Sequence, residues 1–255
     1  ESRLEALKQG APFTYACLTA EEATAPGQWT AAEMDEAVYG NFRFIGTDET
    51  LEMPASKSFA QRAIVAAALA QGTSHLSGYS PCGDNESALA AARKLGARVT
   101  VNGSELEITG IGAFENCLSI SEMPVGESGF LTRMIIPVLS VIADGPVRVT
   151  GEKTLLGRPL AGAHDIMASF GVRLIPEISP LAPLGRNDKE NARKGDCFIP
   201  LTVKGPLVPG RADVSGKGGS QLISGLLAAL PLAGNRSTVY VHDPRSIPYM
   251  FITVD

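Results

Sequence analysis

Pro54-Ala55-Ser56-Lys57-Ser58-Phe59-Ala60-Gln61-Arg62 is a short polar stretch between a strand-like run (42–53) and an alanine-rich helix expected from residue 63. It places an ammonium, two hydroxyls and a guanidinium beside the start of that helix. Backbone N–H groups at a helix N-terminus lack intrahelical partners and the helix dipole is positive there, so a bound anion is favoured. Arg62 lies about one turn after Ser58, so Lys57, Ser58 and Arg62 can face one ligand. Taken alone, the stretch is equally typical of a capping serine followed by solvated charges.

The order of elements around this stretch recurs along the chain. A helix, a glycine-containing break, a strand, a polar loop, a second helix and further strands are expected over about 54–112, again over 113–175 with a strand at 198–203, and in part over 213–255. Leu95-Gly96-Ala97-Arg98-Val99 and Phe170-Gly171-Val172-Arg173-Leu174 match in residue type, which favours a true repeat, although helix–glycine–strand units occur in any α/β protein. We therefore expect an α/β (α+β) fold with mixed sheets and largely buried helices.

The individual elements are expected as follows. Helices are expected at 62–70, 84–95, 130–143, 160–170 and 221–232, with another near Pro248, and strands at 75–76, 98–101, 105–109, 147–150, 171–175, 198–203 and 237–242. Residues 1–41 form an unassigned segment with helix-forming composition at 1–8 and 30–38 and no site. The run 42–53 reads as two short strands, and the charged run 186–194 as an exposed loop.

Composition excludes several classes of function. The formal net charge is −5 and there is no basic block, which argues against a nucleic-acid partner. The three histidines lack metal-ligand spacing, and no apolar run reaches membrane-spanning length, so neither a metal nor a membrane is expected. The cysteines are widely spaced and no signal peptide is recognisable, which predicts reduced thiols in a cytoplasmic protein. These cysteines are Cys17, Cys82, Cys117 and Cys197.

Unusual polar groups also mark the first helix of the other two repeats. The second repeat has Gly126-Glu127-Ser128-Gly129 followed by Arg133, and the third has Gly216-Lys217-Gly218-Gly219-Ser220-Gln221. Glycine lets a ligand approach the backbone closely, and hydroxyls with helix N–H groups suit phosphate or carboxylate.

Further polar residues occupy the loops before the second helices. Arg158 precedes Pro159 in the second repeat, and Ser246 and Tyr249 lie in the equivalent loop of the third. Each signal is weak by itself, because glycine-rich loops are usually linkers and an Arg-Pro pair usually starts a helix. Three repeats around a pseudo-threefold axis would bring all of these residues to one end of the domain. The pattern therefore predicts a shared anion site.

Together these motifs resemble those of the 5-enolpyruvylshikimate-3-phosphate synthases (3-phosphoshikimate 1-carboxyvinyltransferases). The resemblance covers about 42–255 and rests on the stretches 54–62, 126–133, 157–159, 220–221 and 246–249. It implies three βαβαββ repeats about a pseudo-threefold axis, forming one domain of a two-domain enolpyruvyl transferase fold. It implies transfer of the enolpyruvyl group of phosphoenolpyruvate to the 5-hydroxyl of shikimate 3-phosphate in aromatic amino acid biosynthesis. The implied route is addition and elimination through a tetrahedral intermediate, with no metal and no organic cofactor.

The resemblance also implies a role for each matched residue. Lys57 corresponds to a catalytic lysine that touches both substrates, where an ammonium offsets negative charge and assists proton transfer. The residues implied to bind shikimate 3-phosphate are Lys57, Ser58, Arg62, Ser220, Gln221, Ser246 and Tyr249. Those implied to bind phosphoenolpyruvate are Lys57, Gly129, Arg133, Arg158 and Gln221.

Some positions depart from the family pattern. Ala55 replaces a glycine, Glu127-Ser128 replaces an Asn-Ala pair, Phe130 replaces a threonine, and Gly219 stands where a phosphate-binding serine is expected. The Glu127 carboxylate would repel an anionic ligand unless it pairs with Arg133 or another cation.

The resemblance further implies that a second domain, the C-terminal half of the enzyme, is missing from the 255 residues. An open half-site is expected to give negligible turnover. It is expected to bind shikimate 3-phosphate with a millimolar or weaker dissociation constant, a binding free energy of about 4 kcal/mol or less. Two alternatives stay open: a UDP-N-acetylglucosamine enolpyruvyl transferase-like enzyme, and a non-catalytic anion-binding module of the same fold. The former pairs its first lysine with asparagine and has a cysteine in the arginine loop. This chain has Lys57-Ser58 and Lys153 there, which favours shikimate.

Overall fold

The computed structural model describes residues 56–113, 117–177 and 197–254. All of them belong to one of the two compact units into which the chain divides, Met53–Asp255. The helices expected in 1–41, the strands expected at 42–53, Pro54, Ala55, Cys17 and the loop expected at 186–194 lie outside the described residues.

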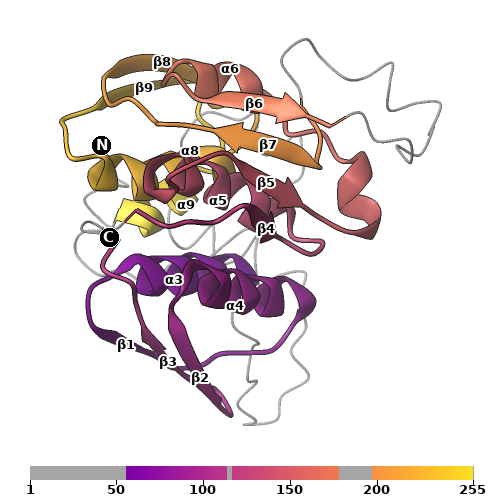
Figure 1. Ribbon diagram of the computed structural model, residues 1–255, viewed down its shortest axis with the longest axis vertical. Coiled ribbons are helices and arrows are strands. Elements are labelled where there is room, and N and C mark those ends of the chain that lie inside the picture. The colour runs from indigo at the N-terminus through magenta and orange to yellow at the C-terminus, as the bar shows by residue number, and fades with distance from the viewer. Residues whose placement is uncertain (1–55, 114–116, 178–196, 255) are drawn as a thin grey trace, which may run out of the picture. The chain divides into compact units, whose positions relative to one another are not determined.

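The first group of elements consists of two helices and an antiparallel sheet. The helices are α3 (Lys57–Leu69) and α4 (Gly83–Leu95), and the strands are β1 (Thr73–Leu76), β2 (Arg98–Asn102) and β3 (Glu105–Thr109), in the order β1-β3-β2. Figure 1 shows both helices on one face of this sheet. Leu106 and Ile108 of the central strand are buried and alternate with exposed neighbours, because successive side chains of a strand point to opposite faces.

The second group contains a four-stranded mixed sheet. Its elements are β4 (Glu122–Pro124), α5 (Gly129–Ile142), β5 (Val147–Thr150), η2 (Lys153–Gly157), α6 (Ala163–Ala168), β6 (Arg173–Pro176) and β7 (Leu201–Lys204). The strand order is β4-β5-β7-β6, with β4 parallel to β5 and the other pairs antiparallel. The sub-order β5-β7-β6 repeats the order β1-β3-β2 of the first sheet, in both direction and chain sequence.

The third group contains two parallel strands, two α-helices and a 3-10 helix. Its elements are β8 (Arg211–Ser215), α8 (Gln221–Ala229), the 3-10 helix η3 (Leu230–Ala233), β9 (Thr238–His242) and α9 (Ile247–Val254). The parallel pair β8-β9 flanks α8 as the parallel pair β4-β5 flanks α5. Strand, helix and parallel strand therefore recur in the second and third groups.

Close packing of α5 against α8 forms the centre of the hydrophobic core. Nearly every residue of α5 is buried, and Gly225 of α8 lies directly against the α5 backbone. A Cβ atom at Gly225 would lie 2.7 Å from the carbonyl oxygen of Met134 and 2.8 Å from that of Arg133. This contact holds the N-terminal turns of α5 and α8 side by side, and both turns carry residues predicted to bind ligand.

The expected mixed α/β class, with parallel and antiparallel pairs, is confirmed. The expected helix starts need one correction of consequence. Helix α3 begins at Lys57, because Ser56 acts as its N-cap and accepts a hydrogen bond from the Phe59 amide at 3.4 Å. Lys57, Ser58 and Arg62 therefore lie on the first turns of the helix and not in a loop before it.

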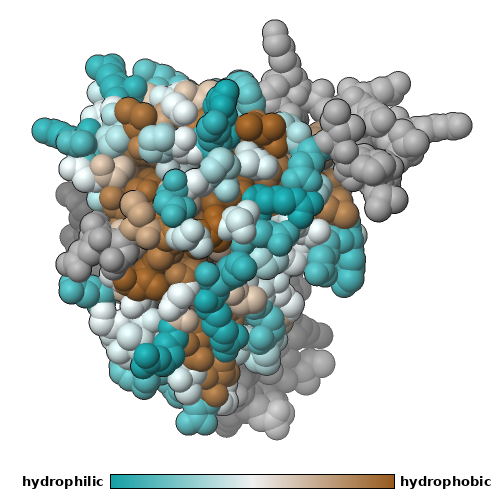
Figure 2. Space-filling model, viewed as in Figure 1, coloured by the Kyte–Doolittle hydropathy of each residue, from teal (hydrophilic) through white to brown (hydrophobic). Residues whose placement is uncertain are grey.

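Other expectations about the elements were incomplete or wrong. The helix expected at 160–170 is a single short helix at Ala163–Ala168, and strands β4 and β8 were not expected at all. Helix α9 has no buried residue, contrary to the expectation that both helices of each unit are largely buried. Its apolar side chains Ile247, Phe251 and Val254 are 42%, 47% and 67% exposed, because no described element packs on its outer side. Figure 2 shows apolar surface in the region where Figure 1 places α9.

Candidate functional site

A hollow of about 500 Å³ lies where the N-terminal turns of α3, α5 and α8 meet the start of α9. The residues that line it are Ser58, Arg62, Phe130, Arg133, Gly218, Gly219, Ser220, Gln221, Ser246 and Tyr249. Seven of these are residues that the sequence predicted as ligands, drawn from all three groups of elements. The predicted residues Lys57, Gly129 and Arg158 are not among those lining it.

Arg62 is the most deeply buried cation of this hollow, with only 5% of its surface exposed. Its guanidinium donates to the Ser58 carbonyl oxygen at 2.8 Å, to Thr253 Oγ1 at 3.0 Å and to Ser224 Oγ at 3.2 Å. The guanidinium carbon also lies 4.4 Å from the centre of the Phe130 ring. All of these partners are uncharged, and burial lowers the pKa of Arg62 below its usual value.

Arg133 is a second guanidinium without a carboxylate partner among the described residues. It donates to the Gly129 carbonyl oxygen at 2.8 Å and to the Pro159 carbonyl oxygen at 2.7 Å. Burial again lowers the arginine pKa. Two partly desolvated cations thus face one hollow with only neutral acceptors around them, and an anion placed there would restore the electrostatic stabilisation that water supplies in the open.

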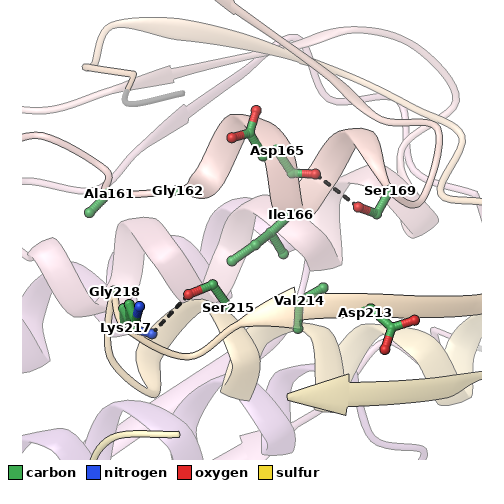
Figure 3. A pocket seen from close by; sticks show the side chains of 10 residues that line it. All are labelled: Ala161, Gly162, Asp165, Ile166, Ser169, Asp213, Val214, Ser215, Lys217 and Gly218. Carbon is green, nitrogen blue, oxygen red and sulfur yellow. Dashed lines mark hydrogen bonds between the residues drawn. The ribbon is translucent and has the colours of Figure 1, made fainter. Parts of the chain in front are cut away.

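The loop before α8 is held against the start of α6. A Cβ atom at Gly218 would lie 2.8 Å from the Ala161 carbonyl oxygen, so only glycine allows this approach. Gly218 also lines a smaller hollow of about 260 Å³. Figure 3 shows that this smaller hollow lies between α6 and β8. Ser220, which ends the loop, is buried and makes no side-chain capping bond to α8, so its hydroxyl can serve a ligand in the larger hollow.

Lys57 lies in a neighbouring hollow of about 340 Å³, lined also by Asp84, Glu127 and Lys153. Its ammonium nitrogen is 2.8 Å from Asp84 Oδ2, and this hydrogen bond raises the pKa of Lys57. The lysine side chain is 64% exposed, so it is charged and accessible. Lys57 is therefore adjacent, along α3, to the 500 Å³ hollow that Arg62 and Arg133 line (the arginine hollow), but it does not line that hollow.

Arg158 lines neither hollow, but it lies near enough to Lys57 and to Arg133 to interact with both electrostatically. Its positive charge opposes the rise in the pKa of Lys57 that Asp84 causes, and it adds to the lowering of the Arg133 pKa by burial, as a nearby like charge does. Its guanidinium donates to Thr154 Oγ1 at 2.9 Å. Gly129 begins α5, directly after the N-cap Ser128, whose hydroxyl accepts from the Leu131 amide at 3.1 Å.

Glu127 is neutralised by a lysine and not by Arg133. Its carboxylate lies 3.1 Å from the Lys153 ammonium, and this hydrogen bond lowers the pKa of Glu127. From the sequence, Glu127 was expected to repel an anionic ligand unless it paired with Arg133 or another cation. The cation that pairs with it is Lys153.

Sequence reasoning missed several residues that support the site. Gln61 is fully buried, accepts from Ser128 Oγ at 2.6 Å and donates to the Lys57 carbonyl oxygen at 3.2 Å, so it ties α3 to the start of α5. Phe130 was noted only as a departure, whereas its ring covers the Arg62 guanidinium. Ser224 shares a helical face with Ser220 and Gln221, a spacing that could have indicated it. Nothing local indicated Thr253.

Neither a metal centre nor a membrane span is found in the part of the chain that is described. No three His, Cys, Asp or Glu side chains gather there closely enough to hold a metal ion. None of the helices there combines the length and apolar character needed to cross a bilayer.

Comparison with known families identifies the chain. The family profile for EPSP synthase (3-phosphoshikimate 1-carboxyvinyltransferase) matches residues 47–255. The chain belongs to the EPSP synthase family. Membership covers the whole described region, including the three helix starts that line the arginine hollow.

Curated relatives in the EPSP synthase family support the same assignment. The 3-phosphoshikimate 1-carboxyvinyltransferase of Methanospirillum hungatei is 31% identical over 205 residues, which are 79% of this chain and 43% of the relative. That of Erwinia tasmaniensis is 31% identical over 210 residues, 81% of this chain and 45% of the relative. The chain thus spans less than half the length of the curated relatives it matches.

A solved structure shares the fold. EPSP synthase from Acinetobacter baumannii superposes with a TM-score of 0.61 at 24% identity, over 76% of this chain and 41% of that one. The likeness extends to the arrangement of backbone elements.

Proposed function

We propose that this chain takes part in the transfer of the enolpyruvyl group from phosphoenolpyruvate to the 5-hydroxyl of shikimate 3-phosphate. The observation that carries the proposal is the pair Arg62 and Arg133, two desolvated guanidiniums at one hollow with only neutral acceptors among the described residues. Family membership supplies the reaction class, and the cationic hollow is the feature that an anionic sugar-acid ester requires.

In this proposal the residues divide between the two substrates. Shikimate 3-phosphate is held by Ser58, Arg62, Ser220, Gln221, Ser246 and Tyr249, all of which line the 500 Å³ hollow, with Lys57 at its side. Phosphoenolpyruvate is held towards Lys57 by Arg133, Arg158, Gln221 and the backbone at Gly129.

Lys57 is the catalytic residue of the proposal. The ammonium is charged at neutral pH, because the hydrogen bond that it donates to Asp84 raises its pKa above the usual lysine value. During the addition and elimination steps, the Lys57 ammonium would offset the negative charge of the substrates' phosphate and carboxylate groups. It would also transfer a proton at the bridging oxygen. No metal or organic cofactor is part of the proposal.

We also propose that the three groups of elements are repeats about a pseudo-threefold axis. The support is the shared strand order of the first two sheets and the parallel strand pair around α5 and α8. Residues 42–255 would then form one domain, with 1–41 outside it. A cytoplasmic location stays a prediction.

The test is a ligand titration of the 255-residue chain followed by amide NMR shifts. Shikimate 3-phosphate is expected to shift the amides of Ser58, Ser220 and Ser246, and Ser220→Ala to weaken binding about tenfold through loss of a charge-assisted hydrogen bond. Ser169→Ala, in the hollow of Figure 3, is the matched control and should leave binding unchanged. UDP-N-acetylglucosamine should not shift these amides. Equal shifts with both ligands, or shifts confined to other regions, would overturn the proposal.

A further inference from the structure

Glu127 joins two segments of the chain that flank the candidate site. Its own segment precedes α5, where Gly126 has φ +58° and a Cβ atom would collide with Ser87 Oγ. The backbone of this segment accepts a hydrogen bond at the Gly126 carbonyl oxygen from the Glu152 amide, at 2.8 Å. The start of η2 is therefore fixed beside Glu127 by the main chain as well as by side chains.

The Glu127 carboxylate acts as a cap for η2 from outside that helix. Glu152, the residue at the N-cap position of η2, makes no side-chain capping bond. Glu127 Oε1 instead accepts from the Thr154 amide at 3.3 Å and from the Thr154 hydroxyl at 3.2 Å, while Oε2 binds the Lys153 ammonium at 3.1 Å. Helix N-termini carry unsatisfied N–H groups, and a carboxylate is the acceptor they favour.

The same contacts lead to Arg158. The Thr154 hydroxyl has one hydrogen, with which it donates a hydrogen bond to Glu127. The same hydroxyl oxygen accepts a hydrogen bond from Arg158 Nη2 at 2.9 Å. Glu127, Thr154 and Arg158 therefore form a directed chain in which each hydrogen bond has a defined donor and acceptor. Lys153, at the start of η2, has φ +46°, a left-handed conformation that costs a non-glycine residue free energy and that surrounding contacts must hold.

We propose that Glu127 is a positioning residue, which anchors η2 and through Thr154 sets the direction of the Arg158 guanidinium towards phosphoenolpyruvate. The choice of phosphoenolpyruvate as the ligand rests on the proposed function. The anchoring of η2 by Glu127 does not depend on it. It assigns a role to the carboxylate that replaces asparagine in the family pattern, where charge alone would predict only repulsion of an anion.

Three variants separate positioning from charge. Glu127→Ala removes the cap and the ion pair. Thr154→Val keeps the amide cap and removes only the hydroxyl link to Arg158. Glu152→Ala is the matched control, because it removes one carboxylate from the same hollow without touching a capping bond.

The first measurement needs no ligand. Amide hydrogen exchange at Thr154 and ¹⁵N relaxation of the Arg158 side chain are recorded for each variant of the full chain. Glu127→Ala is expected to speed Thr154 exchange about fivefold, as the loss of a helix cap does, and to mobilise the Arg158 side chain. Thr154→Val should mobilise Arg158 with exchange at residue 154 nearly unchanged, and Glu152→Ala should change neither. Unchanged Thr154 exchange and Arg158 relaxation in Glu127→Ala would overturn the inference.

The second measurement is affinity for phosphoenolpyruvate. Glu127→Ala and Thr154→Val are expected to weaken it about threefold to tenfold, whereas Glu152→Ala should not weaken it. Tighter binding by both glutamate variants would mean that Glu127 acts by charge alone, which contradicts the inference. If Arg158→Ala binds phosphoenolpyruvate as the parent does, the proposed function of Arg158 fails, and the exchange and relaxation data then decide the anchor by themselves.

Discussion

At the scale of single residues, the candidate site is defined by cations that differ in burial. Arg62 is almost fully buried between an aromatic ring and neutral acceptors, whereas Lys57 is largely exposed and paired with Asp84. A buried charge without a counter-ion costs free energy in the empty protein, and an exposed ion pair contributes little to stability. The two residues should therefore respond differently to substitution.

Arg62→Met tests the buried cation. The methionine side chain keeps much of the contact with Phe130 and removes an uncompensated charge, so we expect the free energy of unfolding to change by less than about 1.5 kcal/mol. Binding of shikimate 3-phosphate should nevertheless be lost in a calorimetric titration. Arg62→Ala, which also leaves a cavity, should be clearly less stable than Arg62→Met in urea unfolding. Retained binding in Arg62→Met would contradict the assigned role.

Lys57→Gln and Asp84→Asn test the exposed pair. Each should cost less than about 1 kcal/mol of stability, because solvent screens the interaction. The pKa of Lys57 is raised in the folded protein, so its stabilising contribution is present below the unfolded value of about 10.5 and is lost as pH rises through the folded value. Urea unfolding at pH 8 and pH 11 checks this.

The two variants of this pair should differ in ligand affinity. Lys57→Gln should weaken binding of phosphoenolpyruvate by about tenfold, because a charge-assisted contact is lost. Asp84→Asn should not weaken it, because the ammonium remains and a competing carboxylate is gone. An equal loss of phosphoenolpyruvate affinity in both variants would show that the ion pair only maintains the local structure and that the ammonium does not contact the ligand.

At the scale of elements, the site depends on the approach of α5 to α8. Gly225 allows this approach, since its Cβ position is within 3 Å of backbone atoms of Arg133 and Met134. Helix propensity alone predicts that Gly225→Ala stabilises α8 by about 1 kcal/mol. Packing predicts the opposite sign.

Gly225→Ala is therefore expected to destabilise the protein by about 1–3 kcal/mol through overpacking, and to shift the Arg133 amide. Thermal and urea unfolding give the magnitude. The matched control is Gly83→Ala in α4, where nothing lies within 4 Å of the added methyl group. A Gly225→Ala protein as stable as Gly83→Ala would rule out the close helix contact.

At the scale of the whole molecule, ligand binding and folding are linked. The hollow collects residues from α3, α5, the loop before α8 and α9, so a ligand there binds only the folded chain. At ten times Kd, shikimate 3-phosphate should raise the free energy of unfolding by about 1.4 kcal/mol. Shikimate without phosphate is the control and should give a smaller shift in Tm at the same concentration. Equal shifts in Tm with the two ligands would show that the contacts to the phosphate group contribute nothing to binding.

Much of the local structure could be predicted from the sequence. Strands β3 and β5 lie at the residues where strands were expected, 105–109 and 147–150, and α4 ends at Gly96, which adopts φ +105° as a helix-terminating glycine does. Short or exposed elements were harder to predict from the sequence. β4 has only three residues, and its pairing with β5 supplies hydrogen bonds that no local pattern encodes.

The sequence by itself determined the mixed α/β class, the polar helix starts and the residue types able to hold an anion, because periodicity and capping act over a few residues. Only the tertiary structure decided which of those groups meet. Arg62 bonds Thr253 across 191 positions of sequence, and Glu127 caps a helix that begins 26 residues later. Such contacts depend on how buried helices pack against one another, and packing is set by the whole core and not by neighbours along the chain.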